Sequence, residues 1–390
     1  MKVAIIFEGS LTNRKGLVNA VLNRIKHLKD IAEYQIDVYS FQLYEGWLTR
    51  RLKHSTSAGE RPDYITIDNI KIRILWYKYS LVDYVLRQKL NFRDIITERR
   101  WGRYSDLFKD YDIITVHSYR CGKFALHIKD LYDIPYYITW HGSDIHTLPH
   151  DNRHIKSRTI RIIEHAACNF FVSKALLKAS ETLSKIGNKE VLYNGASNIF
   201  YQQSPSTRTS LRQQNGVSVS DKVVAYVGNL FDIKNVLLLP QIFEQIKTSY
   251  KAGLQFWIIG DGEKRKELEN LLMRHNIQCR LWGNVNSNKM PDIMNCIDVL
   301  ILPSKNEGLP LVTVEALKCG ANVVGSNVGG IAEVIGEENV FNLNEMFTEN
   351  IARRVVEMLS TPIEQPVRDI FSWTKTANKE NKIYKEFKLD

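Results

Sequence analysis

The chain has 390 residues, of which 44% are hydrophobic and 25% charged. This length predicts two or three domains of about 150 residues each, and the composition is that of a globular protein with large cores. No apolar run approaches the roughly 20 residues that a membrane-spanning helix needs. The first apolar run ends at Glu8, too soon for a signal peptide. The five cysteines lack metal-ligand spacing and indicate reduced thiols in a cytoplasmic protein.

The positive charge of the chain is concentrated in its first half. Residues 1–200 hold 31 Lys and Arg against 21 Asp and Glu, whereas residues 201–390 hold 22 of each. A basic surface suits an anionic membrane face, a phosphorylated acceptor or nucleic acid. Ordinary solvated lysines explain the same charge, so composition leaves these alternatives open.

Short apolar runs alternate along the first half with segments whose apolar residues have helical spacing. Strands are expected at Lys2–Phe7, Tyr34–Phe41, Asp112–His117, Tyr136–Trp140, Asn169–Val172 and Glu190–Asn194. Apolar and polar residues alternate over residues 65–74, with a break at Asp68–Asn69, and this pattern predicts a hairpin. Residues 43–63 are expected to form an exposed loop. Strands that alternate with helices predict a parallel, doubly wound α/β sheet.

A polar stretch, Ser204–Ser210, lacks apolar periodicity and predicts an interdomain linker at about residues 200–215. A second series of strands follows, at Lys222–Val227, Phe256–Ile259, Cys279–Trp282, Val299–Leu302, Asn322–Gly325 and Val340–Leu343. The tail, Phe371–Phe387, is helical in composition and too short for a domain. We therefore expect Rossmann-like domains at 1–200 and 201–368, and a C-terminal helix within 369–390.

The most informative stretch is Ser304–Gly320, which follows the apolar run Val299–Pro303. Glu307 and Glu315 stand eight positions apart, and Gly308–Leu311 turns the chain into a helix between them. A helix start has unpaired N–H groups and a positive dipole, which suit a diphosphate, while carboxylates bind sugar hydroxyls. An ordinary strand–loop–helix is the alternative, although packing alone does not explain two acids at a strand's carboxyl end.

Three more stretches follow expected strands or open an expected helix. Gly228 allows close backbone approach, and Lys234 places an ammonium where a phosphate could bind. His141–Asp144 ends a strand with a histidine able to donate a hydrogen bond or move a proton. Lys15 and Gly16 open the first helix. Each has a plain alternative, namely a surface lysine, a structural histidine or a simple helix start.

Two segments could mislead. Asp110 and Asp112 resemble an Asp-x-Asp metal site, but they precede an expected strand instead of following one, so we interpret them as a loop. Residues 76–111 mix nine aromatic side chains with many basic ones. Such a mixture could bind nucleic acid or a membrane, whereas aromatics at helical spacing are typical of a core.

Together these stretches resemble the retaining, nucleotide-sugar-dependent glycosyltransferases of the GT-B fold, family four. The most specific part is Glu307–Glu315. The other matching stretches are His141–Asp144, Phe171–Ser173, Asn194–Gly195, Gly228–Leu230 with Lys234, Gly260–Gly262, Gly329–Gly330 and Phe371–Trp373. The resemblance implies two Rossmann-like domains that face each other across a cleft, with a C-terminal helix that crosses back to the first domain.

The resemblance also implies roles for single residues. Lys234 would bind the donor diphosphate, Glu315 the ribose hydroxyls and Glu307 the donor sugar, while His141 would face the reacting sugar and acceptor. The implied catalytic residues are His141, Glu307 and Lys234; the implied donor-binding residues are Gly16, Gly228, Asn229, Lys234, Glu307, Gly308, Leu309, Pro310, Leu311 and Glu315; the acceptor-side residues are Lys15 and Asp144.

The implied function is retaining transfer of a hexosyl or N-acetylhexosaminyl group from a nucleotide sugar, typically a UDP-sugar, to a glycan or lipid-linked acceptor in cell-surface polysaccharide biosynthesis. No metal or cofactor and no nucleic acid are expected, and the enzyme would work in the cytoplasm, with peripheral contact at the inner membrane face. Asn229 stands where the family usually has an arginine, and Lys15 replaces a glycine. A nucleotide-sugar epimerase on the same fold is one alternative, and Asn229 supports a second, a catalytically weak scaffold of a glycan assembly complex.

Overall fold

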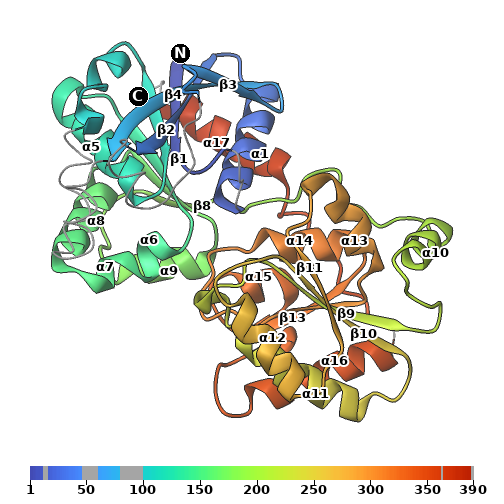
Figure 1. The fold of residues 1–390 in the computed structure, drawn as a ribbon. Helices are drawn as coiled ribbons and strands as arrows, with labels where there is room; N and C mark the ends of the chain where they lie inside the picture. The colour runs from blue at the N-terminus through green and yellow to red at the C-terminus, as the bar shows by residue number, and fades with distance from the viewer. Residues whose placement is uncertain (12–15, 46–59, 80–99, 362, 388–390) are drawn as a thin grey trace. The chain divides into compact units, whose positions relative to one another are not determined.

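The computed structural model describes residues 1–11, 16–45, 60–79, 100–361 and 363–387. These residues form two compact units, each with its own sheet (Figure 1). The first unit comprises residues 1–172, 176–192 and 376–390, and the second comprises residues 173–175 and 193–375. The division after Leu192 lies several residues before the boundary at 200 expected from the sequence.

The first unit contains an eight-stranded sheet in the order β3-β4-β2-β1-β5-β6-β7-β8. Its strands are β1 (Lys2–Glu8), β2 (Gln35–Glu45), β3 (Tyr64–Ile67), β4 (Ile70–Tyr79), β5 (Ile113–His117), β6 (Tyr136–Trp140), β7 (Cys168–Phe171) and β8 (Lys189–Val191). All neighbouring strands are parallel except β3 and β4. The predicted parallel α/β sheet is confirmed.

The antiparallel pair β3–β4 is the predicted hairpin. Its two central residues, Asp68 and Asn69, have φ of 48° and 63°, and such left-handed pairs match the twist of a two-residue hairpin turn. One expectation beside it is wrong, because residues 43–45 belong to β2 instead of a loop. They continue the strand because they pair in register with residues 77–79 of β4. Residues 46–59 lie outside the described part of the chain.

The helical segments of this half and of the chain's end are α1 (Gly16–Ile31), η1 (Ser105–Phe108), α5 (Tyr119–Tyr132), α6 (Ser143–His146), α7 (Leu148–Asp151), α8 (Arg153–His165), α9 (Lys174–Glu181) and α17 (Trp373–Phe387). Aromatic side chains from residues 76–111 pack into the core of the first unit. Trp101 stacks on Phe41 with 3.8 Å between ring centroids, and Phe108 is fully buried. For the described residues of this segment, the core interpretation is confirmed.

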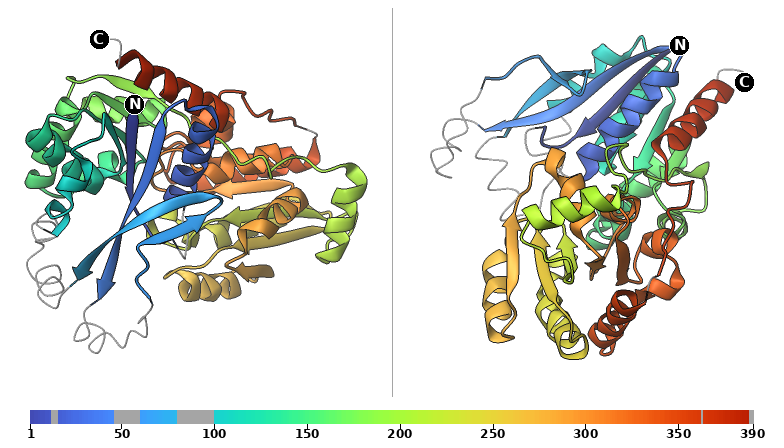
Figure 2. Two further views of the ribbon diagram at one scale, coloured as in Figure 1. Left: turned by 90° about the horizontal axis from the view of Figure 1, so that it is seen from above. Right: turned by 90° about the vertical axis from the view of Figure 1, so that its right-hand side faces the viewer.

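From Thr376 onward, α17 belongs to the first unit, as expected for a C-terminal helix that crosses back. It lies beside α1 (Figure 2), where the Arg24 Nε atom is 2.5 Å from Glu380 Oε2. Both side chains are almost completely buried. Tyr384 donates a further hydrogen bond to Glu380. A buried pair with an additional hydrogen-bond donor fixes the position of the helix, because separating the charges would leave each unpaired.

The second unit contains a six-stranded parallel sheet in the order β11-β10-β9-β12-β13-β14. Its strands are β9 (Lys222–Val227), β10 (Leu254–Ile259), β11 (Cys279–Gly283), β12 (Val299–Leu302), β13 (Asn322–Ser326) and β14 (Val340–Phe341). This is the strand order of a dinucleotide-binding Rossmann domain, in which the chain reverses its direction of winding between the first and fourth strands. Here that switch point lies between β9 and β12.

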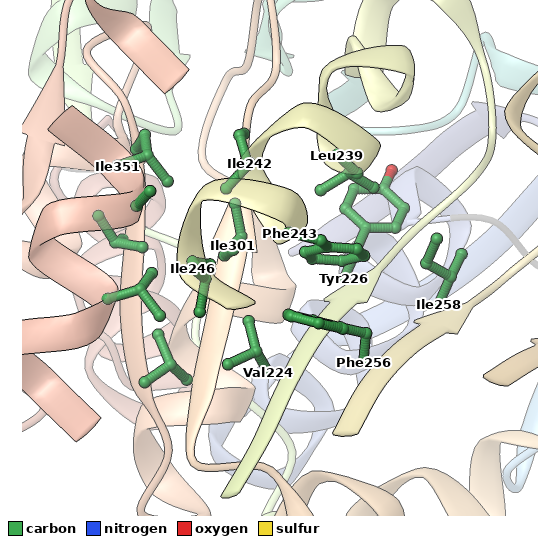
Figure 3. Packing of buried hydrophobic residues seen from close by; sticks show 14 of the residues in the cluster. Val224, Tyr226, Leu239, Ile242, Phe243, Ile246, Phe256, Ile258, Ile301 and Ile351 are labelled. Carbon is green, nitrogen blue, oxygen red and sulfur yellow. The ribbon is translucent and has the colours of Figure 1, made fainter. Parts of the chain in front are cut away.

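The helical segments of the second unit are α10 (Pro205–Gln214), η2 (Asp232–Lys234), η3 (Val236–Leu238), α11 (Leu239–Ser249), α12 (Arg265–Arg274), η4 (Ser287–Lys289), α13 (Met290–Cys296), α14 (Leu311–Lys318), α15 (Ile331–Ile335), η5 (Glu337–Asn339) and α16 (Phe347–Ser360). Helices α11 and α16 pack together on one side of the strands, with α13 and α14 on the other (Figure 1). Figure 3 shows Phe243 of α11 against Val224 and Phe256 of the sheet. The Phe243 and Phe256 rings stack at 4.4 Å.

The expected linker at residues 200–215 is wrong, because most of it is helix α10. Ser204 caps the helix by accepting from the Thr207 N–H, and Pro205 occupies its first turn. Arg212 is buried, and its Nη1 atom lies 3.0 Å from Asp298 Oδ2. Polar contacts, instead of an apolar stripe, hold this helix on the second unit. Apolar periodicity therefore did not reveal it.

Candidate active site

Two loops meet at the switch point of the second unit. One follows β9 and contains Gly228–Lys234, and the other follows β12 and contains Pro303–Leu311. Ligands of open α/β sheets bind beyond the carboxyl ends of the strands at such a point. The backbone N–H of Lys305 donates to the carbonyl of Ile233 at 2.9 Å, which fastens the two loops together.

Lys234 and Glu307, predicted from separate stretches, form an ion pair across these loops. The Lys234 Nζ atom lies 2.6 Å from Glu307 Oε1, and the side chains are 25% and 9% exposed. The Ser304 hydroxyl donates to the same carboxylate oxygen at 2.7 Å. The structure therefore brings two of the three predicted catalytic residues together. Sequence reasoning missed Ser304, although its position three residues before Glu307, directly after a strand, was the available signal.

Glu315 lies on α14, just over one turn from the helix start, as predicted. Pro310 precedes the helix, and its carbonyl accepts from the Thr313 N–H at 3.2 Å. Burial raises the pKa of the Glu315 carboxyl to about 7. A carboxyl whose pKa burial raises this far, just over one turn into the helix after β12, is a candidate for contact with a ligand.

Glycines shape the loops around this pair. A Cβ atom at Gly329, whose φ is 54°, would lie 1.9 Å from the Glu307 carbonyl oxygen. The Gly330 N–H donates to the Gly308 carbonyl at 2.8 Å. Gly329 and Gly330 therefore hold the backbone of residues 307–308 in place, because only glycine permits this close approach.

Gly228 and Asn229 lie on the loop that follows β9. A Cβ atom at Gly260 would lie 1.9 Å from the Gly228 carbonyl oxygen, and the Tyr226 hydroxyl donates to the Asn229 carbonyl at 2.8 Å. The Gly260–Gly262 turn thus supports this loop.

The same edge carries a second lysine that sequence reasoning did not select. Lys305 follows β12 and its Nζ atom lies 2.8 Å from Asp232 Oδ2, in the loop that follows β9. It is a candidate for the positive charge that Asn229 does not supply. Lys15, which was expected on the acceptor side, lies outside the described residues.

The first unit holds the remaining predicted residues. His141 directly follows β6, and its Nε2 atom is 3.1 Å from Nδ1 of His117, the last residue of β5. Burial, followed by the positive charge of Arg24, lowers the pKa of His141 to about 3. The imidazole is therefore neutral at physiological pH.

Asp144, in the short helix α6, is 4% exposed. Burial raises the pKa of its carboxyl to about 6, and its Oδ2 atom has no hydrogen-bond partner among the described residues. Gly16 is the first residue of α1 and is exposed, with open space where a Cβ would stand. The predicted residues thus form two groups, with Gly16, His141 and Asp144 on the first unit and the other donor-binding residues on the second.

Residues 207–369 match the family model of the glycosyl transferases group 1. Two solved structures cover nearly all of this chain: sucrose-phosphate synthase from Thermosynechococcus elongatus, with a TM-score of 0.79, 17% identity and 100% of both chains covered, and Anabaena HepE in complex with UDP-glucose, with a TM-score of 0.69, 18% identity, and 99% of this chain and 100% of that one covered. At such identities they establish the fold. This chain has the GT-B fold.

Two curated relatives match part of this chain. TuaC of Bacillus subtilis, named for teichuronic acid biosynthesis, is 26% identical over 65% of this chain and 63% of its own length. An N-acetyl-alpha-D-glucosaminyl L-malate synthase of Bacillus anthracis is 29% identical over 57% of each. The chain thus matches about three-fifths of the length of these relatives.

Two further properties of the described residues concern the bilayer and metal ions. Among them, no helix combines the length and the apolar character that crossing a membrane requires. Within the same residues, no group of three or more His, Cys, Asp or Glu side chains is placed to hold a metal ion.

Proposed function

We propose that this protein is a retaining glycosyltransferase that moves a sugar from a UDP-sugar to the hydroxyl of a glycan or lipid-linked acceptor. The observation that carries the proposal is the Lys234–Glu307 pair at the switch point of the second sheet. A buried acid and a lysine held together at the ligand-binding edge offer one group for a diphosphate and one for a sugar.

Lys234 acts on the leaving group in this proposal. The diphosphate replaces Glu307 as the partner of the Lys234 ammonium, which stabilises the negative charge that grows as the glycosidic bond breaks. The N–H groups at the start of α14 add to this stabilisation. Glu307, released from the ion pair, accepts hydrogen bonds from the hydroxyls of the donor sugar. Glu315 accepts hydrogen bonds from the ribose.

His141 interacts with the reacting sugar and the acceptor. Since the imidazole is neutral, it hydrogen-bonds without adding positive charge next to a carbon that becomes oxocarbenium-like. We propose a front-face substitution, in which the departing phosphate takes the proton of the acceptor hydroxyl and the new bond forms on the same face. Positive side chains and helix N–H groups replace a divalent metal in this scheme.

The relatives support a choice of donor and acceptor classes. One solved neighbour holds UDP-glucose, and one curated relative is named as an N-acetylglucosaminyl enzyme. We therefore propose a glucosyl or N-acetylglucosaminyl donor. TuaC is named for a cell-surface polymer, which supports a polysaccharide pathway at the inner face of the cytoplasmic membrane. The basic first half suits that face.

The proposal is tested with purified protein in two steps. Thermal unfolding is first measured with UDP-glucose, UDP-N-acetylglucosamine and other nucleotide sugars, because a ligand specific to the folded state raises its stability. Sugar transfer to a panel of glycan and lipid-linked acceptors is then measured for the Lys234→Ala, Glu307→Ala and Lys266→Ala variants. Lys266 is exposed on α12 and serves as the control.

We expect the first two substitutions to lower kcat/KM about 100-fold or more and Lys266→Ala to leave it unchanged. Unchanged transfer in both Lys234→Ala and Glu307→Ala would refute the site. An altered sugar without an acceptor would identify an epimerase. Donor binding without turnover would favour the scaffold, for which Asn229 is the specific support.

A further inference from the structure

His117 is a buried titratable residue to which the proposed function gives no role. It ends β5 at the carboxyl edge of the first sheet and is 2% exposed. Its Nδ1 atom faces His141 Nε2 at 3.1 Å, with 5.4 Å between the ring centroids. Burial of an imidazole costs free energy that burial of an apolar side chain would not. The presence of a histidine at position 117 therefore needs an explanation, and its hydrogen bond to His141 suggests one.

The register of the sheet creates this contact. Strands β5 and β6 are parallel neighbours, and His117 pairs with Thr139. His141 lies two residues beyond Thr139, immediately after the strand. Side chains two residues apart point to the same face of a strand. The His141 ring, just beyond the end of β6, therefore lies next to the ring of His117.

A buried positive charge lies close to the pair. Arg24 Nη1 donates to the Thr139 hydroxyl at 2.7 Å, and Glu380 of α17 holds its Nε atom. Burial, and then the charge of Arg24, lowers the pKa of His117 well below its usual value, as it does for His141. Both rings are therefore neutral. Between two neutral rings one nitrogen must donate a proton and the other must accept, so the tautomer of His117 dictates that of His141.

We propose that His117 is a positioning residue that fixes the ring orientation and the tautomer of His141. The inference rests on the proposed function only where it gives His141 a part in sugar transfer. With the tautomer fixed, the second nitrogen of His141 always has the same hydrogen-bonding character. Hydrogen-bond partners of this kind commonly change activity by about 10–100-fold when they are removed from a functional histidine.

Three substitutions separate positioning from packing. An asparagine amide reaches about as far as the Nδ1 atom that His117 uses, whereas a glutamine amide reaches about as far as Nε2, and leucine removes the polar group. We compare His117→Asn, His117→Gln and His117→Leu, with His127→Leu on the exposed side of α5 as a control. The activity measured is the release of UDP from UDP-N-acetylglucosamine and from UDP-glucose.

We expect His117→Asn to keep kcat within about threefold of the native protein, and His117→Gln and His117→Leu to lose about 10–100-fold. The KM for the donor should stay unchanged in all three, because Lys234, Glu307 and Glu315, to which the proposed function assigns the donor contacts, lie in the second unit. ¹⁵N spectra of histidine-labelled protein provide a separate readout. His141, assigned with His141→Asn, should show a single tautomer in native protein and in His117→Asn, and averaged tautomers in His117→Leu.

The proposal is overturned if the His141 ring signals are the same in native protein and His117→Leu, or if His117→Asn is as impaired as His117→Leu. Failure of the proposed function gives a different result. If native protein releases no UDP from either donor, the transferase assignment falls, and the ¹⁵N spectra alone decide whether His117 fixes the His141 ring.

Discussion

At the scale of single residues, the site depends on polar groups that the fold holds in costly surroundings. Glu307 is nearly buried and is compensated by Lys234 and Ser304. Glu315 has burial alone as the cause of its raised pKa. Such residues are retained at a cost in stability when they serve a ligand. Their contributions can therefore be measured in the protein without substrate.

Glu315 should make the stability of the protein depend on pH. Its pKa rises from 4.5 to about 7 on folding, so between these values the folded state holds a proton that the unfolded state has released. The group's contribution is present below pH 4.5 and is lost as the pH rises through about 7. We expect the free energy of unfolding of Glu315→Gln, relative to native protein, to increase over that range by up to about 3 kcal/mol.

Chemical denaturation at a series of pH values measures this difference. Glu357→Gln, at an exposed position of α16, is the control. A Glu315→Gln difference that does not change between pH 4.5 and 7 would mean that the carboxyl titrates as in the unfolded chain.

Gly329 should tolerate no side chain. An alanine Cβ would stand 1.9 Å from the Glu307 carbonyl oxygen, at a φ of 54° that disfavours any L-residue. We expect Gly329→Ala to lower the free energy of unfolding by about 2 kcal/mol or more. It should also weaken UDP binding, because the backbone of residues 307–308 must move. Gly216→Ala, at a positive φ with open space around it, is the control that separates backbone strain from the clash. Equal losses in both variants would contradict the clash.

At the scale of elements, α10 shows how a polar segment becomes ordered. Its residues resemble a linker because they are hydrophilic, yet Arg208 and Arg212 both reach Asp298, which directly precedes β12. Arg212 also donates to the carbonyls of Cys296 and Asp221. Helix α10, which was expected to be a linker, thus anchors the start of β12, the strand that precedes the Glu307 loop.

Arg212→Ala should be strongly destabilising, because it removes one of the two arginines that pair with the largely buried Asp298. We expect a loss of about 3 kcal/mol in the free energy of unfolding. Gln213→Ala, at the exposed neighbouring position, should cost less than about 0.5 kcal/mol. Denaturant titration of both variants provides the measurement. Similar small effects in the two would restore the linker interpretation.

At the scale of the whole molecule, the last helix of the chain completes the first unit. The buried Glu380 pairs with Arg24, and Tyr384 packs against Tyr137 with 4.8 Å between ring centroids. The first unit is therefore complete only with a segment that follows the second unit in the sequence. Glu380 also supplies the countercharge for Arg24, whose positive charge contributes to the lowered pKa of His117 and His141.

Removal of that countercharge should affect the two units unequally. Glu380→Ala leaves Arg24 buried without its carboxylate, and we expect a loss of about 3–5 kcal/mol in the stability of the first unit. Glu386→Ala, exposed on the same helix, is the control. Hydrogen exchange followed by mass spectrometry resolves the two units. Protection should fall in β1, β5 and β6 and remain in β9 and β12. Equal loss in both sheets would contradict this assignment.

The sequence alone determined the elements whose signal is local. Buried parallel strands are continuous apolar runs, so β9 and β12 were predicted residue for residue, and the Asp68–Asn69 turn needs only two left-handed residues. The start of α14 and the place of Glu315 on it followed from Pro310 and Gly320. The candidate site was found in the same way, since its residues lie in short motifs directly after strands.

Only the tertiary structure decided which of these residues act on one another. The Lys234–Glu307 and His117–His141 contacts arise because neighbouring parallel strands end at one edge, and strand order is not written in any local pattern. Helix α10 was missed because side chains from distant segments stabilise it, not its own apolar face. The pKa values of Glu315 and His141 likewise depend on burial, which is a property of the folded chain alone.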